Sequence, residues 1–322
     1  MRIFPFVSCL VLLLTCSVMA DTPAEGGAKV PTTMRAVISD GAGNLVLSGE
    51  APKPAPKGRE ILVEVLATGI NRIDTYMMMG AFGTVDILGM EISGRVAALG
   101  PDCEGSLAVG DAVIALMSDS GQAEFATVDE RHAMLKPAPL SFAHAAAVPE
   151  QWLTAFQLLH LVGEVRSGDN VLIHAGASGV GTTAIQLVRL AGAIPYVTAG
   201  SEEKLEGCLA VGAEGAFNYK DEEHPWSEAV LAATDGQGVD VILDCVGGSH
   251  AEGNINVLAT DARWVLFGLM GGRSLPTGEN FLVRMMRKRA SLRSTTLRMR
   301  SKEYKADLIQ RFAAEILPHI GS

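Results

Sequence analysis

The fold of this chain follows from residues 171–181, which read Val-Leu-Ile-His-Ala-Gly-Ala-Ser-Gly-Val-Gly. A short apolar run passes into a glycine-rich turn, and residues 182–190 then place apolar side chains at helical spacing. The pattern predicts a strand, a tight turn and a helix that packs on a sheet. Gly176 and Gly179 permit close backbone approaches that a Cβ would block, and Gly181 lets the helix start near the strand.

Strand and helix patterns alternate along the rest of this region. Strands are expected at 194–199, 215–219, 239–246 and 264–268, and helices at 201–211, 226–233 and 252–258. Such alternation predicts an α/β fold with a doubly wound parallel sheet, in which a ligand lies at the carboxyl ends of the strands.

The glycine turn is a candidate site for a dinucleotide. A helix that starts after such a turn offers unpaired N–H groups and its dipole to an anion, typically a pyrophosphate. The predicted cofactor-binding residues of the turn are Gly176, Ala177, Ser178, Gly179 and Val180. A tight turn without a ligand is the alternative, because the spacing is G-x-x-G-x-G and not G-x-G-x-x-G.

The end of the second predicted strand bears on which nicotinamide cofactor is bound. NAD-preferring domains usually place an acidic residue here, bonded to the ribose 2′-hydroxyl. In this chain Ser201 follows the strand and Lys204 lies one helical turn on, and a hydroxyl with a cation suits a 2′-phosphate. Tyr219, after the third strand, is expected to close the same pocket. The sequence therefore favours NADPH, with a solvated helix lysine as the alternative for Lys204.

Composition limits the class of protein. The chain has 322 residues, of which 48% are hydrophobic and 19% charged, so it is expected to be globular with material for two domains. A net charge of −10 argues against nucleic-acid binding. The basic stretch 284–302 interleaves its cations with Leu, Met and Ser, which predicts a helix and a strand with solvated faces.

The first twenty residues resemble a secretory signal peptide, with Arg2, an apolar run over 3–14 and a small-residue cleavage site ending at Ala20. The apolar run is too short to span a bilayer, so no stable membrane span is expected. A polar linker over 21–33 follows.

Cysteine usage points to a different compartment. Outside the signal segment the chain has three cysteines without paired spacing, which indicates free thiols: Cys103, Cys208 and Cys245. The secretory pathway and a cytoplasmic form that starts at Met34 both remain open.

The region before the glycine turn predicts a small β-barrel. Short strands are expected at 34–38, 45–48, 61–68 and 89–96, and residues 71–79 predict a helix.

Several motifs in this order resemble one enzyme family. They are Gly89-x-Glu91-x-x-Gly94-x-Val96, Gly110-Asp111-x-Val113, the turn at 176–181, and Gln186 with Arg189. From residue 34 to about residue 319 the chain resembles the zinc-independent quinone oxidoreductase (zeta-crystallin) family of the medium-chain dehydrogenase/reductase superfamily. One departure is Ser178, where the family usually has glycine.

The resemblance implies a GroES-like catalytic barrel domain over 34–152 and an NADPH-binding Rossmann domain over 153–292. It implies further strands after the matched region, so residues 293–322 are expected to form a truncated C-terminal return segment. Members are commonly dimers, so a homodimer is also expected.

The resemblance bears on the chemistry as well. Zinc-dependent members hold the metal partly through a cysteine and a histidine, where this chain has Asn71 and Met90, and neither replaces a thiolate or an imidazole. A zinc-free hydride transfer from NADPH to a quinone or conjugated enone is therefore implied. Asn71 would contact the acceptor, Asp74 would organise the helix start, and Thr154 would face the nicotinamide. The remaining expected cofactor contacts are Gly247, Leu269, Met270 and Gly271.

Two alternatives remain open. An enoyl-thioester reductase uses the same fold and hydride geometry. A non-catalytic NADPH-binding protein is favoured by Phe82, which stands in a short loop where relatives carry a longer loop with a tyrosine, because a phenyl ring cannot donate a proton.

Overall fold

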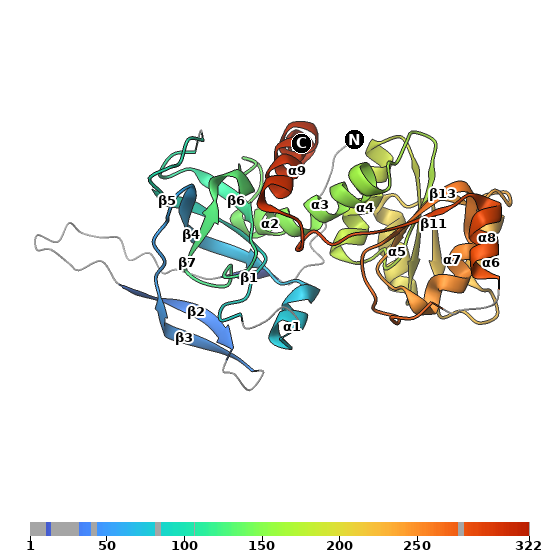
Figure 1. Cartoon of the computed structure of the whole chain (residues 1–322), viewed down its shortest axis with the longest axis horizontal. Coiled ribbons are helices and arrows are strands. Elements are labelled where there is room, and N and C mark those ends of the chain that lie inside the picture. Colours follow the sequence, from blue (N-terminus) through green and yellow to red (C-terminus); the bar gives the residue numbers. More distant parts are fainter. Residues whose placement is uncertain are drawn as a thin grey trace, which may run out of the picture. The chain divides into compact units, whose positions relative to one another are not determined.

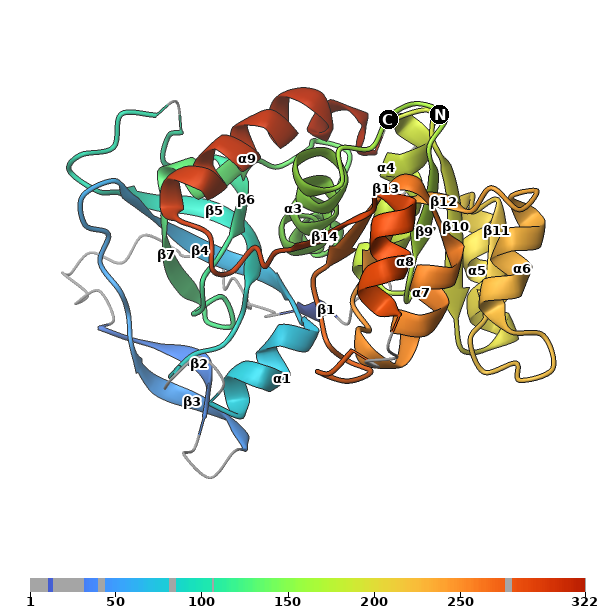
Figure 2. The ribbon, with the colours of Figure 1, turned by 45° about the vertical axis from the view of Figure 1, so that its right-hand side comes forward.

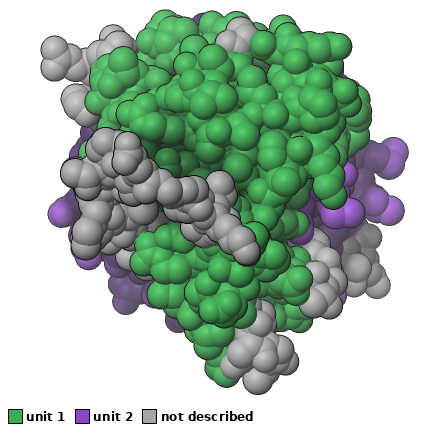
Figure 3. Space-filling model, turned by 90° about the vertical axis from the view of Figure 1, so that its left-hand side faces the viewer, with its two compact units in different colours: residues 1–150, 301–322 green, residues 151–300 purple. Residues whose placement is uncertain are grey.

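The computed structural model describes residues 11–13, 32–39, 44–80, 85–105, 107–275 and 280–321. The chain divides into two compact units, coloured green and purple in Figure 3: unit 1 comprises residues 1–150 and 301–322, and unit 2 comprises residues 151–300. Most of the expected signal peptide and linker lies outside the described residues.

Unit 2 is built on a six-stranded parallel sheet in the order β11-β10-β9-β12-β13-β14. The strands are β9 (Asn170–Ile173), β10 (Ile194–Ala199), β11 (Gly215–Asn218), β12 (Val239–Asp244), β13 (Leu258–Leu266) and β14 (Ser291–Ser294). The order of the strands changes direction between β9 and β12, and a ligand site is expected outside the carboxyl ends at such a point. The doubly wound parallel sheet expected from the sequence is confirmed.

Helices cover both faces of this sheet (Figures 1 and 2). The helices α4 (Gly179–Leu190) and α5 (Glu202–Val211) pack against each other. The helices α6 (Trp226–Ala233), α7 (Ala251–Val257) and α8 (Phe281–Lys288) form a second row. Because right-handed crossovers run in opposite directions on the two sides of β9, these two rows lie on opposite faces. Trp264 is fully buried in the core beneath the second row.

The strand β13 differs from its expected bounds, since it begins at Leu258 and not at residue 264. Its pairing with β12 shifts register between Val239 and Val241. Thr260 and Asp261 lie in this irregular part and are exposed. Polar residues at that point look like a turn in the sequence, which is why the first half of the strand was missed.

Unit 1 contains an antiparallel sheet and a separate hairpin. The sheet comprises β1 (Val11–Leu13), β4 (Glu60–Gly69), β5 (Glu91–Leu99), β6 (Ala112–Leu116), β7 (Phe125–Asp129) and β8 (Ala133–Leu135). Its order is β1-β4-β5-β6-β8, with β7 paired to β4, and β2 (Thr33–Ser39) pairs with β3 (Leu45–Pro52). Alternate residues of these strands, among them Ile61, Val63, Ile92 and Val113, are buried in one apolar core.

Among its described residues, unit 1 contains the α-helices α1 (Arg72–Met78), α2 (Phe142–Ala146) and α9 (Lys302–Glu315) and the start of α3 (Pro149–Phe156). A 3-10 turn spans Glu130–His132, and a π-helical segment, Gln157–Val162, follows α3 in unit 2. Helix α9 buries Leu308, Ile309 and Phe312 and packs against β8 and that 3-10 turn. None of the helices in the described ranges is long and apolar enough to cross a membrane.

Candidate functional site

In the glycine turn after β9, Gly176 and Gly181 leave no room for a side chain. A Cβ on Gly176 would stand 2.5 Å from the Cβ of Val197, and one on Gly181 would stand 2.5 Å from the carbonyl oxygen of Ala175. The second obstacle is backbone, which cannot rotate away as a side chain can. The turn therefore brings the start of α4 against the ends of β9 and β10, as its sequence implied.

The first turn of α4 forms a cradle for an anion. The helix begins at Gly179, earlier than the expected residue 182, because the Ser178 hydroxyl accepts the N–H of Gly181 at 3.0 Å and caps it. The N–H groups of Ala177, Gly179 and Val180 have no hydrogen-bond partner among the described residues. Free N–H groups and the positive end of the helix dipole fit a pyrophosphate group.

The three residues expected around the 2′-phosphate follow the ends of β10 and β11. Ser201 is the N-cap of α5, and its carbonyl oxygen accepts the N–H of Lys204 at 3.1 Å. The N–H of Tyr219 donates to the carbonyl oxygen of Ala199 at 3.1 Å, and the Tyr219 hydroxyl lies close to Gly200. Lys204 is exposed, and Tyr219 is 43% exposed, so both side chains are accessible to a ligand.

Two turns at the ends of β12 and β13 interlock. The N–H of Gly271 donates to the carbonyl oxygen of Val246 at 2.7 Å, and the N–H of Met270 donates to that of Cys245 at 3.1 Å. Gly247 has a φ of 77°, which glycine adopts without strain. Leu269 and Met270 remain about half exposed. The structure thus brings together Gly247 and residues 269–271, all four of which were expected to line the cofactor site.

A buried polar network that the sequence did not predict lies beneath these turns. The Asp244 carboxylate is fully buried and accepts the N–H groups of Val246 at 2.7 Å and Gly247 at 2.9 Å. It also accepts Asn254 Nδ2 at 3.0 Å and Trp264 Nε1 at 2.9 Å. Asp244 therefore fixes the shape of the Gly247 turn.

His174 is a structural residue of the same network. Its Nδ1 lies 2.9 Å from Thr198 Oγ1 and its Nε2 lies 2.6 Å from Asn254 Oδ1. Burial lowers the pKa of His174 below its ordinary value, although Asp244 nearby opposes this shift. Both ring nitrogens are occupied, so the ring is not placed to exchange a proton with a ligand.

In unit 1, Asn71 and Asp74 lie together at the start of α1. The Asp74 carboxylate is buried and accepts the backbone N–H of Asn71 at 2.7 Å, which fixes the helix start. The side chain of Asn71 points to a residue that the sequence did not single out for the site. Its Nδ2 donates to Glu91 Oε1 at 2.8 Å.

Glu91 is fully buried and joins two helix starts. Its second oxygen, Oε2, accepts the N–H of Glu150 at the start of α3, at 2.8 Å. The chain passes so close that a Cβ on Gly69 would stand 2.0 Å from Oε1. Burial raises the pKa of Glu91 to about 8, while the hydrogen bonds from Asn71 and Glu150 oppose that shift.

The two positions that correspond to zinc ligands in zinc-dependent relatives are occupied by a carboxamide, Asn71, and a thioether, Met90. Met90 is 2% exposed and packs against Met77 and Leu88, while Asn71 is bonded to Glu91. Within the described ranges, no group of three or more His, Cys, Asp or Glu side chains is arranged to hold a metal ion. These residues do not fit a zinc site.

Of the two remaining residues that the sequence singled out, the structure describes Thr154 but not Phe82. Thr154 lies on α3 and is half-buried. Phe82 lies outside the described residues.

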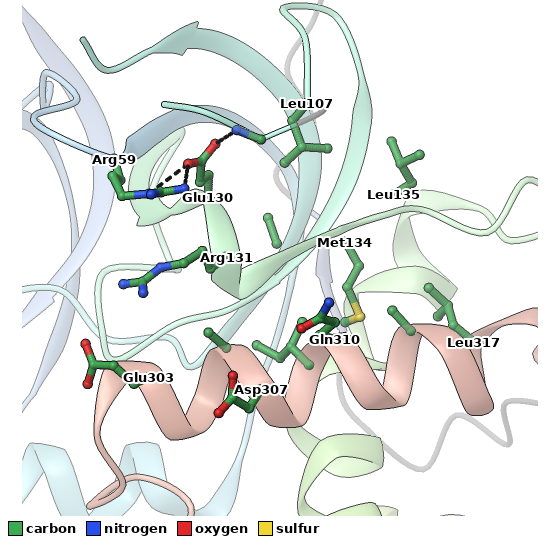
Figure 4. Close-up of a pocket in the computed structure, with 15 residues that line it drawn as sticks. Arg59, Leu107, Glu130, Arg131, Met134, Leu135, Glu303, Asp307, Gln310 and Leu317 are labelled. Atoms are coloured by element: carbon green, nitrogen blue, oxygen red, sulfur yellow. Dashed lines mark hydrogen bonds and ion pairs between the residues drawn. The ribbon is translucent and has the colours of Figure 1, made fainter. Parts of the chain in front are cut away.

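A groove of about 720 Å³ in unit 1 lies between α9 and the strand β8 (Figure 4). Arg59 and Arg131 line one wall, and Asp307 projects from α9 (Figure 4). Arg59 pairs with Glu130 and Arg131 with Asp129, each at 2.7 Å, so these cations are already neutralised by neighbouring carboxylates. None of the expected site residues is among the described residues that line this groove, and we assign it no ligand.

Sequence comparisons place both parts of the chain. Residues 57–158 match the alcohol dehydrogenase GroES-like domain, and residues 179–314 match the zinc-binding dehydrogenase domain. The solved structure of an NAD-dependent alcohol dehydrogenase is 30% identical, with a TM-score of 0.74 over 87% of this chain and 89% of that one. The chain belongs to the medium-chain dehydrogenase/reductase superfamily. Its fold is the expected GroES-like domain followed by a Rossmann domain, and members of the superfamily bind a nicotinamide cofactor.

Other members of the superfamily are also similar to the chain. A mycobacterial quinone oxidoreductase structure is 28% identical, with a TM-score of 0.78 over 90% of this chain and 89% of that one. The CurK enoyl reductase structure is 27% identical, with a TM-score of 0.75 over 89% of this chain and 86% of that one.

Two much longer relatives are polyketide synthases. The phenolphthiocerol synthesis polyketide synthase type I Pks15/1 of Mycobacterium bovis is 36% identical over 220 residues, and erythronolide synthase EryA2 of Saccharopolyspora erythraea is 36% identical over 240. These matches cover 68% and 73% of this chain but only 10% and 7% of those proteins. Quinone oxidoreductases and enoyl reductases thus both occur among the relatives, and the chain is an oxidoreductase of this superfamily.

Proposed function

We propose that the chain is a zinc-independent reductase that uses NADPH to reduce a quinone or a conjugated enone. Within its superfamily we place it in the quinone oxidoreductase family, together with the tumour-suppressor-inducible quinone oxidoreductases. The observation that carries the proposal is the Asn71–Glu91 pair, which puts a fixed carboxamide where a zinc enzyme needs a thiolate ligand.

The residues of the chain then have separate roles. Bound NADPH supplies a hydride. The N–H groups of Gly179 and Val180 bind its pyrophosphate, while Lys204 binds its 2′-phosphate. Asn71 gives one N–H to Glu91 and keeps a second, which donates to the carbonyl oxygen of the acceptor as negative charge develops there.

The other expected residues position this machinery. Asp74 holds the start of α1 through the Asn71 N–H. Thr154 faces the nicotinamide. Ser201 and Tyr219 complete the 2′-phosphate pocket, and Gly247, Leu269, Met270 and Gly271 line the cofactor site.

Reduction of an enoyl thioester is the second candidate, favoured by the similarity to the CurK enoyl reductase and to the polyketide synthases. It uses the same hydride donor and the same donor to a carbonyl oxygen. Purified chain should be tested with NADPH and NADH against a benzoquinone, a naphthoquinone, an alkyl enone and crotonyl-coenzyme A. Turnover of the quinones or the enone supports the first candidate, and turnover of the thioester alone supports the second. NADPH binding without any turnover would contradict both.

Metal removal should leave this activity unchanged. The chemistry of Asn71 and Met90 offers zinc neither a thiolate nor an imidazole. Quinone reduction should therefore keep its rate after exhaustive dialysis against a chelator, with metal content measured before and after. Stoichiometric zinc that is lost together with activity would refute the zinc-free assignment.

Lys204→Ala should change the preference between cofactors. Loss of one charged hydrogen bond to the 2′-phosphate should weaken NADPH binding by about 1.5–3 kcal/mol and leave NADH binding nearly unchanged. Titration calorimetry of both cofactors measures this, with Lys57→Ala, an exposed lysine of unit 1, as the control. Equal losses for NADPH and NADH would remove Lys204 from the 2′-phosphate pocket.

A further inference from the structure

Gln151 is a largely buried glutamine whose carboxamide has no hydrogen-bond partner within the described ranges. It lies on α3 and is 4% exposed, yet no hydrogen bond joins its carboxamide to another described residue. Gln157, six residues further on, is equally buried, but its Nε2 donates to Thr295 Oγ1 at 3.1 Å. The amide atoms of Gln151 are not among the described side-chain atoms that lack both a partner and contact with solvent, so the carboxamide stays accessible and can donate to a ligand.

The position of the Gln151 carboxamide identifies that ligand. A Cβ on Gly179 would stand 2.2 Å from Gln151 Oε1, so the amide lies directly against the first residue of α4. The N–H groups of Gly179 and Val180 at the same helix start also lack partners among the described residues. The Gln151 carboxamide and the N–H groups of Gly179 and Val180 thus lie together at the start of α4, and none of them has a hydrogen-bond partner among the described residues.

We propose that Gln151 binds the cofactor directly, donating from Nε2 to an oxygen of its pyrophosphate. The inference rests on the proposed cofactor site. A glutamine amide can turn its NH₂ or its oxygen toward the same point, so the donor is available whichever end faces Gly179 in the free protein. Gly179 is then needed for two reasons, since it admits both the phosphate and the glutamine that helps to hold it.

Binding measurements on the full chain test this assignment. Dissociation constants for NADPH and for adenosine 2′-monophosphate are measured by calorimetry for the wild type, Gln151→Leu and Gln151→Glu. Gln151→Leu should weaken NADPH binding about tenfold or more, and Gln151→Glu should weaken it further because a carboxylate repels the phosphates. Adenosine 2′-monophosphate has no pyrophosphate, so its affinity should stay within about twofold in both variants.

The melting temperature of the ligand-free protein separates binding from a structural role. Gln151→Leu removes no internal hydrogen bond, so the melting temperature should stay the same or rise. The matched control Gln157→Leu loses its bond to Thr295 and should melt earlier, with unchanged NADPH affinity.

Two results would overturn the assignment. One is unchanged NADPH affinity in Gln151→Leu, which would refute the Gln151 contact alone. The other is a parallel loss of both ligands with a fall in melting temperature, which is the signature of a structural residue. Failure of the wild type to bind NADPH would refute the cofactor site itself, and the Gln151 assignment with it.

Discussion

Replacing Asp244 by asparagine should lower the free energy of unfolding by about 2–6 kcal/mol, because two buried N–H donors lose their acceptor at about 1–3 kcal/mol each. The wild-type carboxylate accepts four N–H donors, from Val246, Gly247, Asn254 and Trp264. Asparagine offers one oxygen and one NH₂ group. Whichever way it turns, two of the four donors face an NH₂ group and lose their acceptor.

The same substitution should also weaken cofactor binding. The pair of donors at Val246 and Gly247 gives the Gly247 turn its shape, and this turn interlocks with residues 268–272. When the new amide turns its NH₂ group toward Val246 and Gly247, both bonds to the turn are lost and the turn relaxes, so the dissociation constant for NADPH should rise along with the loss of stability.

Urea unfolding curves and NADPH titrations measure both effects. Asp235→Asn is the matched control, because Asp235 is exposed and asparagine tolerates its φ of 50°. A loss below about 1 kcal/mol in Asp244→Asn would show that the four bonds do not act as one network.

The fold could be predicted from the sequence where its signals are local. The strand β10 and the helix α6 have the expected bounds, because an apolar run and a helical repeat are each complete within a few residues. The strand β13 was predicted only in part, since its first half is recognisable only through its pairing with β12. Parallel pairing joins residues far apart in the chain, and no local pattern reports it.

The candidate site divides in the same way. The glycine turn and Asn71 could be found because their residue types and spacing are distinctive. The buried carboxylates beside the site could not be found in this way. Glu91 meets Asn71 and Glu150 only in the folded chain. Asp244 likewise meets Asn254 and Trp264 only there. The sequence did hold one signal for both carboxylates, because each is an acidic residue within an apolar strand segment. Such a residue is rarely fully buried unless it is paired, so a buried partner was to be expected.

Glu91 should make the folded chain less stable as pH rises, which is the opposite of what a carboxyl group with a lowered pKa does. Its pKa is raised from 4.5 to about 8, chiefly because burial disfavours the charged form. The folded chain therefore holds this proton more tightly than the unfolded chain does. Glu91 makes its full contribution to the free energy of unfolding below pH 4.5. Between pH 4.5 and about 8 this contribution falls by about 1.4 kcal/mol per pH unit, and above about pH 8 it is lost.

Glu91→Gln should remove this dependence. Glutamine is neutral at every pH, its oxygen can accept the Glu150 N–H, and its NH₂ can donate to Asn71 once the Asn71 carboxamide turns over. The variant should be close to the wild type in stability near pH 5 and more stable than the wild type near pH 8.

Urea unfolding at intervals between pH 5 and 8.5 measures the difference between the two stability curves. Glu50→Gln, at an exposed position of β3, serves as the control and should follow the wild type throughout. The difference for Glu91→Gln should grow with pH because only the wild type must place a charge on a fully buried side chain. Parallel curves for wild type and Glu91→Gln would mean that the buried carboxyl group does not change its protonation on unfolding, and the raised pKa would then be wrong.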